Sequence, residues 1–199
     1  MNHVFLKDLL LEMPQLGSYL EPDAAANIQR VLSVKINTGE LGGSVKLSTL
    51  DGGFFFVHGL ANGAYDVWMA MFHKIDNGNE LCFASCLKQT NWLIDDLVTY
   101  KVEISKRFTS FPKHSAATAY VEWVRRFPEG VVLTSDKRLS EQGAGVWKEL
   151  LTRPDLHEEV FVWNTNEKRR ETVLDWNDVF GHEERYTDLV VALKTLPQK

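Results

Sequence analysis

The order of elements between residues 97 and 151 constrains the fold of this chain most strongly. Apolar and polar residues alternate over residues 97–104, which predicts a strand, and a loop with several basic residues follows over 105–115. The next stretch predicts a helix, because four apolar residues share one of its faces: Ala117, Tyr120, Val121 and Val124. A short apolar strand over 131–134 and a second helix over 140–153 complete the series. A strand, helix and strand in succession predict parallel or mixed pairing in one sheet.

The preceding residues predict helices followed by an antiparallel meander. Residues 4–13 and 23–33 have the apolar spacing of amphipathic helices. The clearest hairpin joins the apolar runs 65–75 and 80–87 through residues 76–79, which contain the Asn-Gly turn signal. Polar residues at 89–91 predict a break before the strand at residue 97, and Asp95-Asp96 directly before that strand predict a turn. Further strands are expected over 44–49, 54–57, 159–163 and, as a strand or a helical turn, 188–193.

These elements predict an α/β fold with a mixed twisted sheet of six or seven strands and helices on both faces. We expect a single domain over residues 1–199, in which residues 164–199 form a C-terminal extension of undetermined role.

Charge and composition limit the class of protein. A net charge of −5 argues against broad electrostatic binding of nucleic acid, although basic residues concentrate between Lys101 and Arg126. No apolar run reaches the roughly 20 residues of a membrane span, and the first residues lack the features of a signal peptide. Cys82 and Cys86 lie about 13 Å apart if they share a strand, at about 3.3 Å per residue, which is too far for a disulfide. Free thiols suit a reducing compartment, so a cytoplasmic protein is expected, and no metal site is predicted because further ligands are not in view.

The order of helices, a meander, and then strand, loop, helix, strand, helix and strand resembles the GNAT superfamily of acyl-CoA-dependent N-acyltransferases over roughly residues 44–163. In that family the strand before the loop splays from its neighbour, and its backbone pairs with the pantetheine arm of acetyl-CoA. The loop carries Gln/Arg-x-x-Gly-x-Gly/Ala, whose backbone N–H groups bind the pyrophosphate. The resemblance therefore implies acetyl-CoA as a cofactor.

Placed on this chain, the resemblance assigns the strand to residues 97–104 and the loop motif to 112–117. It implies that Glu103 is the general base that takes a proton from the acceptor amine. An alternative is that this carboxylate faces solvent and pairs with Lys101 or Lys106. The resemblance also implies a cofactor site formed by Ile104, Arg107, Lys113, His114, Ser115, Ala116 and Ala117.

The chain departs from the family pattern at positions with chemical roles. Pro112 replaces the first residue of the loop motif, and Ser115 replaces its first glycine. Trp147 stands where the family has a tyrosine that protonates the leaving thiolate, and an indole N–H cannot do so at neutral pH. A spaced pattern is also similar to divergent GNAT-like proteins of bacteriophages: Ser135-Asp136, Leu139-Ser140, Gly143, Trp147 and Leu150.

Two functions from different classes remain open. The first is an acyl-CoA-dependent N-acyltransferase that transfers an acetyl group to an amine of a small molecule or protein. The second is a catalytically inactive GNAT-fold protein, such as a viral one, that binds a host or virion protein in the host cytoplasm. The second predicts an exposed apolar patch around residues 54–57 or 176–180. A homodimer is compatible with both.

Overall fold

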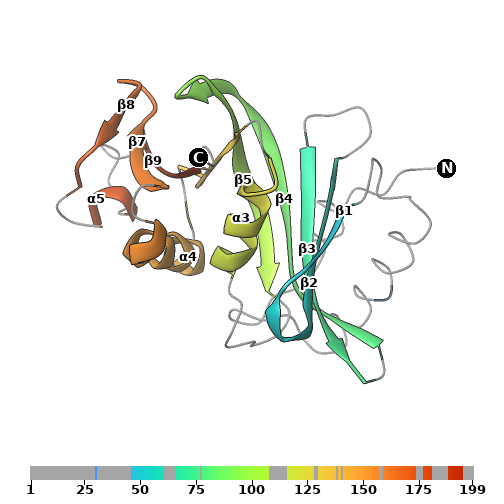
Figure 1. The fold of residues 1–199 in the computed structure, drawn as a ribbon. Helices are drawn as coiled ribbons and strands as arrows, with labels where there is room; N and C mark the ends of the chain where they lie inside the picture. The colour runs from blue at the N-terminus through green and yellow to red at the C-terminus, as the bar shows by residue number, and fades with distance from the viewer. Residues whose placement is uncertain are drawn as a thin grey trace. The chain divides into compact units, whose positions relative to one another are not determined.

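The structure is a computed structural model, and it describes residues 30, 46–60, 66–76, 78–107, 116–127, 130–137, 139, 141–156, 159–173, 177–180 and 188–194. It is an α/β fold whose nine strands follow the order β1-β2-β3-β4-β5-β6-β9-β7-β8 (Figure 1). Contacts divide the chain into two compact units, Met1–Lys88 with Glu103–Ala119, and Gln89–Val102 with Tyr120–Lys199. The helices predicted over 4–13 and 23–33 lie outside the described residues, apart from Arg30, which is helical.

The first unit contains an antiparallel meander, as the sequence predicts. Its elements are β1 (Lys46–Thr49), a 3-10 turn η1 (Asp51–Gly53), β2 (Phe54–Leu60), β3 (Asp66–Ile75) and the first part of β4 (Gly78–Ile94). Each strand pairs antiparallel with the next, and Ile75 pairs with Gly78 at the end of the β3–β4 hairpin. The turn is therefore shorter than the four residues predicted at 76–79, because Gly78 and Asn79 already pair with β3.

The middle strands of this unit are buried on both faces, which explains their nearly continuous apolar sequence. Every residue is buried over 67–72 of β3 and over 82–87 of β4. Cys82 and Cys86 belong to this core and do not form a disulfide, as their spacing predicts.

Gly59 gives the Trp68 side chain the room it needs in this core. The two residues are paired across β2 and β3, and a Cβ at position 59 would lie 2.7 Å from Trp68 Nε1 and 2.8 Å from Cε2. The indole is rigid and buried, so it cannot move aside without disturbing its neighbours.

We expect Gly59→Ala to lower the free energy of unfolding by about 1–3 kcal/mol, because the added methyl overpacks the core. Gly145→Ala is the matched control. No atom lies within 4 Å of a Cβ at that exposed helical position, so the same change should raise stability by about 0.5–1 kcal/mol. Chemical denaturation of both variants measures the effect, and destabilisation of equal size in the two would contradict this account of Gly59.

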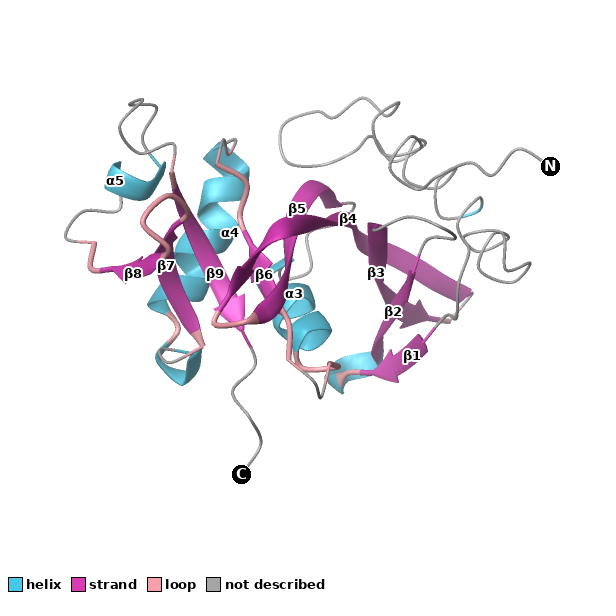
Figure 2. Ribbon diagram, turned by 90° about the horizontal axis from the view of Figure 1, so that it is seen from above, coloured by secondary structure: helices cyan, strands magenta, loops and turns pink. Residues whose placement is uncertain are grey.

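The second unit is built around a parallel crossover. Its elements in chain order are β5 (Leu97–Arg107), α3 (Ala116–Val124), β6 (Val132–Thr134), α4 (Glu141–Thr152), a 3-10 turn η2 (Pro154–Leu156), β7 (Val160–Asn164), β8 (Arg169–Glu171), α5 (Asn177–Phe180) and β9 (Leu189–Lys194). β5 and α3 also contribute residues to the first unit. β5 pairs parallel with β6, which confirms the pairing predicted from the element order. β9 lies between β6 and β7 and is antiparallel to both (Figure 2).

The prediction of six or seven strands is wrong, because the sheet has nine strands among the described residues alone. β8 explains part of the difference, since it is a three-residue strand of sequence Arg-Arg-Glu with no apolar alternation. The break predicted at residues 89–91 is also wrong, because β4 continues to Ile94. Thr90 stabilises this continuation by donating its hydroxyl to the carbonyls of Trp92 and Thr99, at 3.0 and 3.1 Å.

The described helices of the second unit lie on one face of its strands. Thr99 and Val132 are paired across β5 and β6 and point to one face, so their neighbours Tyr100 and Leu133 point to the other. Tyr100 contacts Trp123 of α3, with ring centroids 5.3 Å apart, which places α3 on this second face. Tyr120 of α3 in turn stacks on Trp147 of α4.

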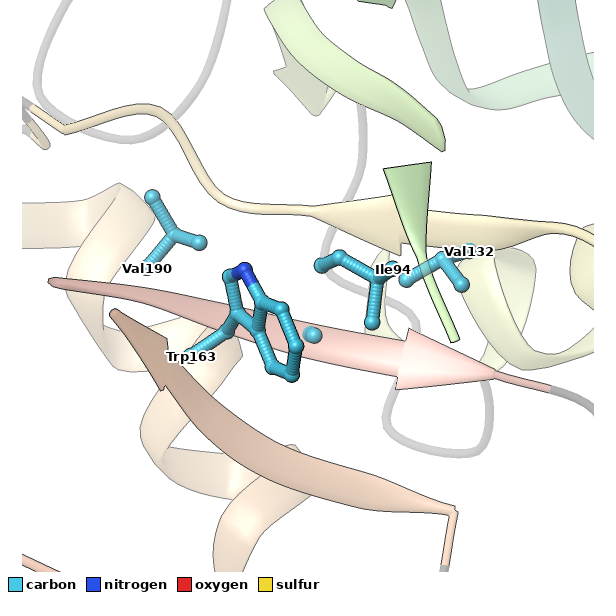
Figure 3. Close-up of a cluster of buried hydrophobic side chains, with 5 residues drawn as sticks. Ile94, Val132, Trp163 and Val190 are labelled. Carbon is cyan, nitrogen blue, oxygen red and sulfur yellow. The ribbon is translucent and has the colours of Figure 1, made fainter. Parts of the chain in front are cut away.

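The tip of the β4–β5 hairpin covers the opposite face. Ile94 is buried there in a cluster with Val132, Trp163, Val190 and Ala192 (Figure 3). Trp92, Leu97 and Phe161 pack against this cluster. In the described part of this unit the predicted second layer of helices is therefore replaced by a hairpin. None of the helices in the described ranges is long and apolar enough to cross a membrane.

Candidate functional site

The parallel crossover from β5 through α3 to β6 is the feature that the sequence marks as the candidate site. Three registered pairs join the strands, namely Thr99 with Val132, Tyr100 with Leu133, and Lys101 with Thr134. Thr134 adds a hydrogen bond from its hydroxyl to the carbonyl of Tyr100, at 3.3 Å. β6 ends at this residue, whereas β5 continues to Arg107. The two strands thus share only the first half of β5.

The helix of the crossover has the buried face that its sequence predicts. Ala117, Tyr120, Val121 and Val124 are all buried. Trp123 and Ala119 are buried as well, so that only Thr118 and Glu122 of this helix are partly exposed. α3 is therefore held by packing over almost its whole circumference, which fixes the position of its N-terminus within the fold.

Glu103, the candidate general base, lies in the later part of β5. Its carboxylate is 3.8 Å from the ammonium of Lys88 on β4, and its side chain is 14% exposed whereas that of Lys88 is 52% exposed. The sequence suggested pairing with Lys101 or Lys106, but Lys101 lies 4.0 Å from Asp136 instead. The carboxylate therefore has a structural partner from the neighbouring strand, and its catalytic role stays a prediction.

The residues expected to bind the cofactor fall into three groups. Ile104 and Arg107 lie in β5, so the loop predicted to begin at residue 105 starts at residue 108 or later. Lys113, His114 and Ser115 lie outside the described residues. Ala116 and Ala117 form the first turn of α3 and are both buried, which leaves their backbone and not their side chains to contact a ligand.

Trp147, which the resemblance places where a catalytic tyrosine would stand, is a core residue. Trp147 is 2% exposed and stacks on Tyr120, with ring centroids 5.6 Å apart and an angle of 27° between the rings. Tyr100 supplies a phenol on β5, but burial raises its pKa above the usual value of about 10, which makes it a weaker proton donor. Neither side chain supplies an obvious acid for a leaving thiolate.

Several residues of the pattern similar to phage proteins also have structural roles. Ser135 is buried, accepts a hydrogen bond at its hydroxyl from the N–H of Val191 at 3.0 Å, and donates its own N–H to the Val191 carbonyl at 2.9 Å. It thereby joins the end of β6 to β9. Leu150, on the same side of α4 as Trp147, is fully buried. These positions are explained by packing and strand pairing without a ligand.

Within the patches predicted for a binding protein, the structure describes the side chains of Phe54, Val179 and Phe180, and of these only Phe180 is partly exposed. Phe54 is buried and stacks on His73, with ring centroids 4.3 Å apart, and Val179 is buried in α5. In the described part of the chain the exposed large apolar side chains are Leu93 and Val98, both near the tip of the β4–β5 hairpin. No three His, Cys, Asp or Glu side chains gather as metal ligands in that part either.

An ion-pair cluster at the hairpin tip was not foreseen from the sequence. Asp95 and Asp96 have φ angles of 51° and 62°, which confirms the turn predicted there and matches the left-handed backbone of a two-residue hairpin turn. The Asp95 carboxylate accepts hydrogen bonds from Lys194 Nζ at 2.5 Å and Arg170 Nη2 at 3.0 Å. These bonds, the one from Lys194 above all, lower the pKa of Asp95 below its usual value of about 3.8, so that it stays ionised at neutral pH. We call Asp95, Lys194 and Arg170 the ionic clasp.

Sequence signals for the clasp are weak, because its partners lie 75 and 99 residues away from Asp95 along the chain.

Comparisons with models of known protein families, with curated proteins and with solved structures found no match for this chain.

Proposed function

We propose that the protein is an acyl-CoA-dependent N-acyltransferase that transfers an acetyl group to an amine of a small molecule or protein. The observation that supports this most is the crossover, in which β5 pairs with β6 only as far as Lys101 and then continues to Arg107. The part of β5 that extends beyond its pairing with β6 has backbone N–H and C=O groups that can bind an extended amide-containing ligand. Such a ligand would pair with β5 as an additional strand does.

The described residues fit such a ligand in two respects. Ile104 and Arg107 lie on the extended part of β5, where backbone groups would pair with the pantetheine arm. Ala116 and Ala117 then begin α3 with small side chains, so that an anion can approach the backbone of the helix N-terminus. Lys113, His114 and Ser115 would add positive charge and hydrogen-bond donors for the pyrophosphate.

The proposed chemistry is direct attack of the acceptor amine on the acyl group. Acetyl-CoA supplies an activated acyl carbon, and the thiolate is the leaving group. Glu103 would accept the proton of the amine, which requires the amine within hydrogen-bond distance of its carboxylate. Because Trp147 cannot donate a proton to the thiolate, water or the medium would supply it.

A second function, a catalytically inactive protein of the same fold that binds a host or virion protein, is favoured by two observations. Trp147 is built into the core where the resemblance implies an acid, and Glu103 is paired with Lys88. Both side chains have structural contacts that account for their presence without catalysis.

Acetyl-CoA at millimolar concentration should raise the melting temperature of the protein, because a ligand that binds only the folded state stabilises it. At about 100 times the dissociation constant the gain is about 2.7 kcal/mol, which corresponds to a shift of roughly 5–10 °C for a chain of this size. Lys113→Ala should reduce the shift. Lys101→Ala is the matched control, since Lys101 lies in β5 beside Asp136, and it should retain the full shift.

The thermal shift and a second binding measurement together separate the two functions. Titration calorimetry with coenzyme A should give a measurable heat of binding for the acyltransferase. Absence of both a thermal shift and a binding heat at millimolar cofactor would contradict the acyltransferase and leave the binding protein as the better account.

A further inference from the structure

The tip of the β4–β5 hairpin is attached to the rest of the second unit by one face only. Ile94 is fully buried in the cluster with Trp163 and Val190 (Figure 3). On the outward side, Leu93 is 56% exposed and Val98 is 38% exposed. Side chains alternate along a strand, so a two-residue turn places these two residues together on the face that does not dock. The tip is thus a separate layer that lies on the strands below it.

The ionic clasp joins this layer to two of those strands. Asp95 belongs to the turn, whereas Arg170 lies on β8 and Lys194 on β9. Both cations bond to the same carboxylate oxygen, Oδ2 of Asp95. In the described residues, Asp96 beside it makes no ion pair, although it has the same charge and a similar backbone conformation.

The two cations are positioned by an aromatic ring as well as by the carboxylate. The Arg170 guanidinium lies 3.9 Å from the centroid of the Phe161 ring, and Lys194 Nζ lies 5.9 Å from it. Contact with the face of the Phe161 ring stabilises both cations next to the hairpin tip. It also restricts the conformation of the Arg170 side chain independently of Asp95. Removal of the Asp95 charge would leave two like charges facing the same ring with no anion between them.

We propose that the ionic clasp is a conformational latch: the hairpin tip opens from the β7–β9 face as a unit, and the bonds from Lys194 and Arg170 to Asp95 set the closed fraction. Opening releases Ile94 from Trp163 and Val190. Because the clasp residues are partly exposed to solvent, with 36% of the Asp95 and 46% of the Arg170 side chain accessible, salt weakens the latch and raises the open fraction. The inference does not depend on the proposed acyltransferase activity.

Hydrogen–deuterium exchange of the full chain at neutral pH and low salt tests the latch. Asp95→Asn removes the charge and keeps a residue that tolerates the left-handed conformation, so backbone amides of the tip at 92–98 should exchange about tenfold faster. Asp96→Asn makes the same change one residue away and should leave the exchange of these amides as in the unchanged protein. Lys194→Gln added to Asp95→Asn should have little further effect, because the two residues act through one contact.

Two further readouts make the result decisive. Sodium chloride at 1 M should speed exchange of the tip amides in the unchanged protein toward the rate of Asp95→Asn, and should hardly alter that variant. Amides of residues 69–71 in β3 serve as the reference for global unfolding. Equal exchange in the two Asn variants, or no response to salt, would overturn the latch. Faster exchange at 69–71 by the same factor would also overturn it, because Asp95 would then stabilise the whole fold and not the tip.

Discussion

Trp147→Ala should lower the free energy of unfolding by about 3–5 kcal/mol, which is the usual cost of removing a large aromatic side chain from a packed core. The residue is 2% exposed and stacks on Tyr120, so its loss removes apolar burial and leaves a cavity between α3 and α4. Domains of ordinary stability have a free energy of unfolding of about 5–15 kcal/mol, so this substitution would remove a large part of it. Urea denaturation followed by circular dichroism measures the change.

Lys148→Ala is the control for this prediction, because it truncates the next residue of the same helix. Lys148 is exposed and lies 5.5 Å from the centroid of the Phe180 ring, so we expect a loss below about 1 kcal/mol. Similar losses for the two variants would show that Trp147 does not hold α4 against α3. The core role matters for function, because a residue that anchors the core cannot be exchanged freely for the tyrosine that the proposed resemblance implies at this position.

Glu103→Gln should reduce acetyl transfer to an amine by about 10²–10⁴-fold, since this is the usual contribution of a general base. The amide is close to the carboxylate in size and cannot accept the amine proton. The acetyl-CoA-induced rise in melting temperature should persist, because Glu103 is not among the residues proposed to bind the pyrophosphate. A transfer assay with a panel of primary amines, run beside the thermal shift, measures both effects.

Glu122→Gln provides the matched control. Glu122 is on α3 and its carboxylate lies 3.0 Å from Arg126, so the same substitution again removes the charge of an ion-paired glutamate. We expect transfer at the unchanged rate in this variant. If Glu103→Gln also transfers at the unchanged rate, Glu103 is the structural partner of Lys88 and not a base.

The local parts of the fold could be predicted because their causes are local. The alternating and continuous apolar runs predicted β3, β5 and β6 to within a few residues, since burial of a strand face needs that periodicity. Asp95-Asp96 was expected to be a turn. The buried face of α3 followed directly from helical spacing.

The candidate site could be predicted only in outline. The order of strand, helix and strand placed Glu103, Ile104 and Arg107 on or beside one parallel strand, but gave no indication that Lys88 would pair with Glu103. The ion pair depends on the register between β4 and β5, which a linear pattern does not specify. Similarly, the polar residues at 89–91 looked like a break because one of the hydrogen bonds that support the strand runs from the Thr90 hydroxyl to the Thr99 carbonyl on β5, which a linear pattern does not show.

The amino-acid sequence by itself determined β3, β5, α3, β6 and α4, and that a parallel crossover links β5 to β6. Only the tertiary structure decided that β9 enters between β6 and β7, that a hairpin covers the face expected to carry helices, and that Asp95 meets Lys194 and Arg170. The physical reason is that periodicity records which side of each element is buried, whereas the choice of partner depends on the combined packing and pairing of segments far apart in the chain.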